Sequence, residues 1–527
     1  MGKRFTLSLI VIVFVVIGLL PILRMFINSV MVNGQVSLLN YKALLSSGRA
    51  WALLKNSLEL SILTTIIAMV IGVPMGLIIG KTDMPFRSFF KLLFIIPLLI
   101  PPYITAVAWF SILGREGFLS KILGLTIAAN MSSFLFALPG CVLVLSTTFM
   151  PIVMFLTATY VKSINTHLEE AARLVAPWET VAKDIIIPMI LPGILLSAIL
   201  VFLLSLGEFS VPMFLRYDVF PVESFTQFSA FYNYSAGTAF VIPLIIIAFV
   251  ILLGERLFLK DKTYQLKPAS GEKLLVIKLG KIKWLIAACV GVLCFVMVIM
   301  PILALVIQSA TFTTYTKALE KSGDSLLRSI SYAIVGATLL TIVGIFFGYL
   351  IHRREFSYWR AVDSLTIFLF ALPSTVIGIG LAGLWNRPLT NFIYGTAAII
   401  IFGYIAQYTA LTSRIMVSSF AQIPPSMEEA SQIVGAGWFR RLSLVLAPLA
   451  KRGLLAAWLV GYIFCLKDTG ISMIVYPTGH DTFPVRTFTL MANSPTNFIA
   501  ALCVIMIVAT LLPMGLLGLI YRQKRMV

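Results

Sequence analysis

Long apolar stretches alternate with short polar breaks along the whole chain. Runs of about 20 apolar residues recur, and a helix of that length crosses a hydrocarbon core about 30 Å thick. The pattern predicts an all-α membrane protein with about twelve transmembrane helices, at 5–27, 57–80, 90–113, 134–160, 185–207, 237–258, 282–308, 329–351, 362–385, 391–418, 443–467 and 495–521. The first run is too long for a signal peptide and no small-x-small cleavage site follows it, so we expect it to be retained.

Charge then orients these helices. The chain has 527 residues, of which 59% are hydrophobic and 12% charged, with a formal net charge of +19. Most of the 40 Lys and Arg residues fall at the termini and in every second loop. The positive-inside rule places those loops and both termini in the cytoplasm. We therefore interpret the charge as a topology signal that also suits anionic membrane lipid, and we expect no nucleic-acid partner.

The two halves of the chain align with each other. At an offset of 272 residues the matching positions are Ser57, Gly72 and Gly76 with Ser329, Gly344 and Gly348, and the stretch Pro97–Trp109 matches Pro373–Trp385 at an offset of 276. Six predicted helices per half give both copies the same orientation, which is a parallel repeat. We predict a first repeat at 1–258, a cytoplasmic linker at 259–283 and a second repeat at 284–527. The duplication is either a simple enlargement or a sign that a solute pathway runs between the halves.

A charged break occurs at the same place in each repeat. The first copy carries Glu169, Glu170, Ala171, Ala172 and Trp178, and the second carries Glu428, Glu429, Ala430, Gly435 and Trp438. Each break predicts a short helix, capped by Asn165 or Thr166 in the first copy and by Ser426 in the second, then a turn that presents the Trp. Either the helix lies on the lipid headgroups or it docks another protein. Anionic lipid would repel the acidic pair, which favours docking.

These breaks resemble the EAA loop of ABC importer permeases, in which Glu-Ala-Ala precedes a Gly and then a conserved Pro. The second copy follows the pattern from Glu429 through Gly435 to Pro448, with Ser431 in place of the second Ala. The first copy has Glu170-Ala171-Ala172 and Pro188, but it is one residue shorter and has no Gly at the turn. The whole chain resembles the fused permeases for ferric iron and thiamine.

The resemblance implies a type I ABC importer permease fold and a bacterial inner-membrane location. It implies two copies of a separate ATPase subunit, each seated on one EAA helix, and an extracytoplasmic substrate-binding protein. Ferric iron is the first cargo it suggests, with thiamine, phosphonate and polyamine as alternatives. The chain itself would not be an enzyme.

Three acids are candidates for the solute pathway. Glu208 and Asp468 occupy matching positions at the predicted external ends of two helices, and Glu59 lies near the start of another. An ionisable group near the membrane is a functional hypothesis by default, and such acids could guide a cation weakly. The alternative is an ordinary water-facing residue at the end of a helix, with Asp468 paired to Lys467.

The remaining chemistry is sparse. The five Cys residues all fall in apolar runs, the three His residues fall in three different loops, and the phosphate-cradle sequence GxxxxGK[ST] is absent. We expect no catalytic residues, no metal site and no cofactor. A secondary transporter with two six-helix halves is a more distant alternative, because the predicted helices carry few of the charges that ion coupling needs. A membrane-embedded enzyme would need a nucleophile, base or metal cluster that the sequence lacks.

Overall fold

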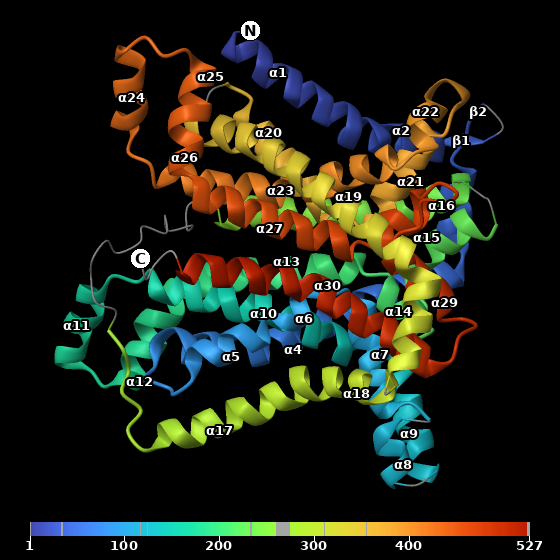
Figure 1. Ribbon diagram of the computed structural model, residues 1–527, viewed down its shortest axis with the longest axis horizontal. Helices are drawn as coiled ribbons and strands as arrows, with labels where there is room; N and C mark the ends of the chain where they lie inside the picture. The colour runs from blue at the N-terminus through green and yellow to red at the C-terminus, as the bar shows by residue number, and fades with distance from the viewer. Residues whose placement is uncertain are drawn as a thin grey trace. The chain divides into compact units, whose positions relative to one another are not determined.

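The computed structural model (Figure 1) describes residues 2–32, 35–115, 117–123, 125–231, 234–259, 275–309, 311–354 and 356–523. The regular elements of these residues are helices joined by turns and loops, together with a two-stranded antiparallel ribbon in which Met31 of β1 pairs with Val36 of β2. Within the described ranges, eight helices are long and apolar enough to cross a membrane, or up to twelve if each bent pair is one span. The prediction of an all-α membrane protein with about twelve spans is confirmed.

The chain divides into two compact units. Unit 1 holds residues 1–48, 220–245 and 311–527, and unit 2 holds residues 49–219 and 246–310. The elements of unit 2 are α4 (Gly48–Lys81), α5 (Arg87–Phe94), α6 (Ile96–Leu99), α7 (Pro102–Leu113), α8 (Phe118–Leu123), α9 (Leu125–Leu135), α10 (Leu138–Lys162), α11 (Thr166–Val175), α12 (Trp178–Val181), η2 (Ala182–Ile186), α13 (Ile187–Gly207), α14 (Ser210–Phe214), α17 (Ile282–Cys294), η3 (Phe295–Ile299) and α18 (Met300–Ser309).

Unit 1 is built around α19 and α23, which pack on each other and on α27. Its elements are α1 (Lys3–Phe14), η1 (Val15–Leu19), α2 (Leu20–Ser29), β1 (Met31–Val32), β2 (Gln35–Val36), α3 (Leu39–Ser46), α15 (Phe220–Ser229), α19 (Phe312–Arg353), α20 (Trp359–Ala371), α21 (Ser374–Trp385), η4 (Pro388–Thr390), α22 (Asn391–Tyr394), α23 (Ala398–Ala421), α24 (Pro425–Ile433), α25 (Trp438–Arg441), η5 (Leu442–Leu446), α26 (Ala447–Leu449), α27 (Lys451–Lys467), α28 (Gly470–Val475), α29 (Phe483–Leu490) and α30 (Thr496–Gln523). The helix α16 (Tyr234–Leu259) begins in unit 1 and ends in unit 2.

The units cut across the predicted repeats, because the first helix of each repeat packs with helices of the other repeat. In unit 1, α2 packs on α21, where a Cβ at Gly380 would lie 3.2 Å from Ile22. In unit 2, α18 packs on α7. The two contacts are equivalent by the repeat, so the exchange is reciprocal. Residues 260–274 of the predicted linker lie outside the described residues.

Among the described residues, four π-helical turns occur at repeat-related places. They are η1, η2, η3 and η5, and each is followed two residues after its end by a proline: Pro21, Pro188, Pro301 and Pro448. Proline has no N–H to donate to the carbonyl four residues earlier, and its ring crowds that carbonyl. A widened turn just before the proline relieves both problems within a continuing helix.

Proline also breaks the third span of each repeat. The helix axis bends by 103° between Leu99 and Pro102, and by 105° between Ala371 and Ser374. The spans predicted at 90–113 and 362–385 are therefore each a bent pair of helices. In unit 1 the break is stabilised by Gln407, whose Nε2 donates to the carbonyls of Phe370 at 3.1 Å and Leu372 at 2.8 Å. A side chain thus pairs the backbone that the broken helix exposes.

Two glycines one turn apart allow the second span of each repeat to lie close to the fourth. A Cβ at Gly76 in α4 would lie 2.5 Å from Cβ of Thr157 in α10. At the equivalent position in α19, a Cβ at Gly348 would lie 2.5 Å from Cβ of Met416 in α23. The small residues therefore set the spacing of these helices. The second spans are also longer than predicted, since α4 has 34 residues and α19 has 42.

We predict that Gly348→Val destabilises the protein, because the new side chain would overlap Met416. Overpacking of this kind costs about 1–3 kcal/mol. The matched control is Gly323→Ala in the same helix, where a Cβ meets nothing within 4 Å. That control should be neutral or stabilising, since alanine is favoured over glycine in a helix by up to about 1 kcal/mol. Thermal unfolding in detergent, followed by fluorescence, measures both, and equal midpoints would contradict the packing described.

Candidate functional site

The charged breaks form two short helices outside the predicted spans, α11 in unit 2 and α24 in unit 1. The start of α11 is capped as predicted, because the backbone N–H of His167 donates to Oδ1 of Asn165 at 2.9 Å. The start of α24 differs from the prediction. Its N-cap is Pro424 with no side-chain cap, so Ser426 lies within the first turn. Pro425 has a fixed φ and no N–H, which suits the first helical position.

The adjacent glutamates of each break have opposite surroundings. Glu169 is 0% exposed and Glu428 is 8% exposed. The side chain of Glu170 is 55% exposed, and Glu429 is also exposed. Neighbours on a helix point about 100° apart, so one acid of each pair faces the protein and the other faces outward. The pair predicted as one docking feature is therefore two features.

The inward acid of α11 pairs with the last residue of α4. Nζ of Lys81 lies 2.5 Å from Oε2 of Glu169, and the lysine is 3% exposed. Burial raises the pKa of the Glu169 carboxyl, while the hydrogen bond from Lys81 and its charge lower it. The other carboxylate oxygen, Oε1, is buried without a hydrogen-bond partner among the described residues.

The inward acid of α24 has more partners. Nη2 of Arg353, the last residue of α19, lies 2.6 Å from Oε2 of Glu428. The hydroxyl of Tyr349 donates to Oε1 at 2.9 Å, and Nε of Arg441 lies 3.8 Å from the same oxygen. The ring of Tyr349 packs edge-on against Trp438, with 5.9 Å between centroids. Hydrogen bonds and rings thus hold this carboxylate from several sides.

The two cations are equivalent by the repeat. Lys81 and Arg353 are 272 residues apart, the same offset that relates Gly76 to Gly348. Sequence reasoning missed both residues. A signal was available, since each is a cation at the cytoplasmic end predicted for an apolar span. Nothing in the sequence showed which acid it would meet.

The turns after the two helices differ. Gly435 ends α24 with φ of +83°, a left-handed conformation that glycine adopts without strain. Ala176 ends α11 in an extended conformation, and Nη1 of Arg173 donates to its carbonyl at 2.7 Å. In the first copy, which lacks the glycine, α11 therefore ends without a residue in the left-handed conformation.

The two tryptophans and Ala172 are half-buried against their own units. Trp178 and Ala172 pack against a buried cluster that includes Tyr160 and Val181. The guanidinium of Arg173 lies 4.9 Å from the Trp178 ring centroid. Trp438 is half-buried against Tyr349. Both rings are thus half-buried and have partners within their own units.

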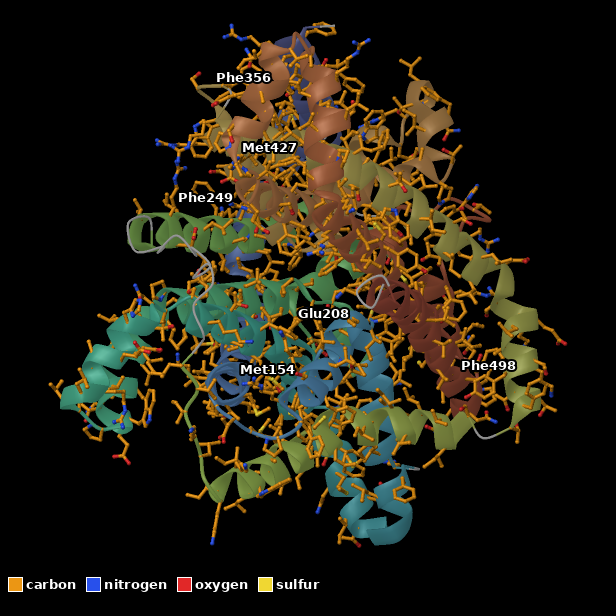
Figure 2. The ribbon with its side chains drawn as sticks, turned by 60° about the vertical axis from the view of Figure 1, so that its left-hand side comes forward. Met154, Glu208, Phe249, Phe356, Met427 and Phe498 are labelled. Atoms are coloured by element: carbon orange, nitrogen blue, oxygen red, sulfur yellow. The ribbon has the colours of Figure 1, made fainter. Side chains whose placement is uncertain are left out.

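What the helices do present is aliphatic. Leu174 and Val175 at the end of α11 are each 87% exposed, and Ile433 and Val434 at the end of α24 are 86% and 87% exposed. Leu168 and Met427 are repeat-related and exposed as well, and Figure 2 labels Met427 on α24. We define the α11 surface as Leu168, Glu170, Ala171, Leu174 and Val175, and the α24 surface as Met427, Glu429, Ala430, Ile433 and Val434. All ten side chains are exposed.

The predicted pathway acids have local roles. Oε1 of Glu208, labelled in Figure 2, accepts from the backbone N–H of Ser210 at 2.9 Å and from its hydroxyl. Asp468 is buried and accepts from the backbone N–H of Ser472 at 2.9 Å and from Tyr408 at 2.8 Å. Each acid thus satisfies donors at the start of the next short helix, where negative charge is favoured.

Glu59 forms an exposed pair with Lys55 one helical turn earlier in α4, at 3.7 Å. Within the described part of the chain, no three His, Cys, Asp or Glu side chains gather in a group that could hold a metal ion.

Known proteins are similar to this chain over most of its length. A ferric transport system permease protein FbpB 1 of Haemophilus influenzae, named as putative, is 24% identical over 82% of this chain and 71% of its own. The ferric permease FbpB of Actinobacillus pleuropneumoniae is 25% identical over 83% of this chain and 66% of its own. The spermidine/putrescine permease PotC of Haemophilus influenzae is 26% identical, but over only 38% of this chain and 77% of its own.

A solved bacterial homologue of human peptide transporters has 14% identity and a TM-score of 0.15, which carries no argument.

The family model for the binding-protein-dependent transport system inner membrane component matches twice, at residues 72–262 and 341–526. Each match contains one of the charged breaks. This family consists of the membrane components of ABC importers, which carry no catalytic site for ATP and work with an ATPase subunit and a substrate-binding protein. The chain belongs to this family, and it is a fused, multi-pass inner-membrane permease of an ABC importer.

Proposed function

We propose that α11 and α24 are the two docking helices for ATPase subunits, and that the permease imports ferric iron. The observation that carries the docking proposal is the duplicated pair of aliphatic side chains, which are almost fully exposed beside an exposed acid. Large apolar side chains outside the spans lower the free energy when a protein partner covers them. An outward carboxylate at the edge of such a surface would select a basic partner.

Lipid is the competing occupant of these surfaces. The aliphatic residues could dip into the headgroup layer, but Glu170 and Glu429 would then face an anionic leaflet at a cost. The family works with ATPase subunits, and two equivalent surfaces suit two copies of one subunit. ATP is present in the cytoplasm, so the ATPase subunits must bind on the cytoplasmic side of the membrane. The positive-inside pattern supports a cytoplasmic location for both breaks and both termini.

The proposal of ferric iron rests on likeness to relatives. Three relatives that match 82–88% of this chain have names that include ferric or Fe(3+) transport, and a fourth, which matches 83% of it, is named as an ABC transporter permease without a cargo. The polyamine and 2-aminoethylphosphonate permeases match 38–39% of it. The docking machinery is common to importers of different cargo, so it carries no information on the ion. A binding protein would deliver the cargo to the external loops.

We predict that Glu170→Arg combined with Glu429→Arg releases the ATPase. Each reversal would place a cation against a basic partner surface, and two such losses should weaken binding by at least about tenfold. The measurement is the amount of ATPase that co-purifies with the permease in detergent. The control is Glu320→Arg combined with Asp324→Arg, which changes the net charge equally at two exposed acids elsewhere. Retention of the ATPase by the docking variant would contradict the proposal.

The pathway acids give a second prediction. Glu208→Gln combined with Asp468→Asn should slow the uptake of 55Fe(III) from its loaded binding protein by at least about threefold. The reason is that neutral amides would replace two carboxylates near the proposed solute pathway. The amides keep oxygen acceptors for Ser210 and Ser472, so the fold should survive. A matched Tyr408→Phe variant removes a donor to Asp468 but keeps its charge, and it should transport normally. Unchanged uptake by the double variant would leave the acids with a capping role alone.

A further inference from the structure

We infer that Lys81 and Arg353 are positioning residues: through their ion pairs with Glu169 and Glu428 they connect each docking helix to the second span of its repeat. We call each of these connections a joint, and we infer that the joint is weaker in the first repeat. The inference rests on the proposed docking role of α11 and α24. It concerns the next step, which is how a displacement of those helices reaches the membrane.

Each docking helix has very few buried side chains. In α24 the only buried residue is Glu428, and in α11 the buried residues are Thr166 and Glu169. The inward carboxylate is therefore the polar attachment of each helix to the body of its unit, beside the packing of Ala172 in α11 against its apolar cluster. A short polar helix without such an attachment would be held by its chain connections and by the turn that follows.

The cation on the other side of each pair ends a long, closely packed helix. Lys81 follows Gly76 and Gly80, and a Cβ at Gly80 would lie 3.2 Å from Cα of Ala158 in α10. Arg353 follows Gly348, which packs on α23 in the same way. Close packing transmits displacement because the interior is nearly incompressible. A displacement of the inward carboxylate would therefore be transmitted to two packed helices, α4 and α10 in unit 2 or α19 and α23 in unit 1.

The two joints differ in the number of partners. Lys81 is the only cation within ion-pair distance of Glu169 among the described residues, and Oε1 of that acid has no hydrogen bond. Glu428 has Arg353, Tyr349 and Arg441. Loss of Lys81 would strand a buried charge, whereas loss of Arg353 would leave two polar partners in place. The first joint should therefore fail more completely.

The first joint has a feature that the linker supplies. The backbone N–H of Ile277 donates to the carbonyl of Lys81 at 2.8 Å, and the backbone N–H of Asp83 donates to the carbonyl of Ile277 at 3.2 Å. Oδ1 of Asp83 accepts from the N–H of Leu279 at 2.8 Å. The chain that leads into the second repeat is thus attached directly beside the Lys81–Glu169 pair.

The test is hydrogen–deuterium exchange of the permease–ATPase complex in nanodiscs, with and without ATP and vanadate. In the unmodified complex, nucleotide should change exchange in α11 and in the last turns of α4, residues 75–81. In Lys81→Met the ATPase should stay bound and α11 should still respond, but the response of residues 75–81 should fall by at least about threefold. In Arg353→Met the response of residues 347–353 should fall by less than about twofold, because Tyr349 and Arg441 remain.

Rescue variants distinguish a positioning role of Lys81 from a general effect of its loss on folding. Lys81→Arg should keep the response, and Lys81→Glu combined with Glu169→Lys should restore it even if Lys81→Met fails to fold. Lys55→Met, at an exposed pair on the same helix, is the control that should change nothing.

An undiminished response of residues 75–81 in Lys81→Met would overturn the inference, and equal losses in Lys81→Met and Arg353→Met would overturn the inequality. If nucleotide does not change the hydrogen–deuterium exchange of α11 in the unmodified complex, the docking proposal on which the inference rests would instead be overturned.

Discussion

A buried carboxylate that meets a cation at the end of a membrane helix is the interaction on which the structure of both charged loops depends. The loops are polar and short, and their helices bury one or two side chains each. Charge in a low-dielectric site is costly unless it is paired, so the acid holds its helix in the single orientation that lets it reach Lys81 or Arg353. That orientation turns the second acid and the aliphatic residues outward. The ion pair inside is thus consistent with the set of side chains that α11 and α24 expose.

Duplication explains why so many features come in matched sets. The glycines of α4 and α19, the prolines after the π-helical turns, the broken third spans and the inward acids all recur at similar offsets. The copies have nevertheless diverged in detail. One turn has Gly435 with a positive φ and the other has Ala176 in an extended conformation. One carboxylate has a single cation and the other has a network. A fused chain can therefore hold two docking helices of the same design with unequal attachments.

The apolar runs and the internal repeat predicted much of this architecture. The apolar runs indicated the spans, and the repeated Glu-Glu-Ala sequences indicated the loops with their acids. The inward and outward acids could not be told apart, because that distinction depends on where α4 ends relative to α11. The same holds for Trp178, which a polar context placed at the surface but which has an apolar cluster beneath it. The hydrogen bond from Tyr408 to Asp468 was hidden, since the two residues lie 60 positions apart. Long-range pairing of this kind leaves no local periodic signal.

The central claim is that the α11 surface and the α24 surface contact the same kind of ATPase subunit. The most direct measurement is photo-crosslinking in native membranes, with a photoreactive amino acid at Leu174 in one variant and at Ile433 in another. The account predicts that each variant captures the same ATPase, and that native mass spectrometry finds two copies per permease. Capture of lipid alone at both positions, with no ATPase in the complex, would contradict it.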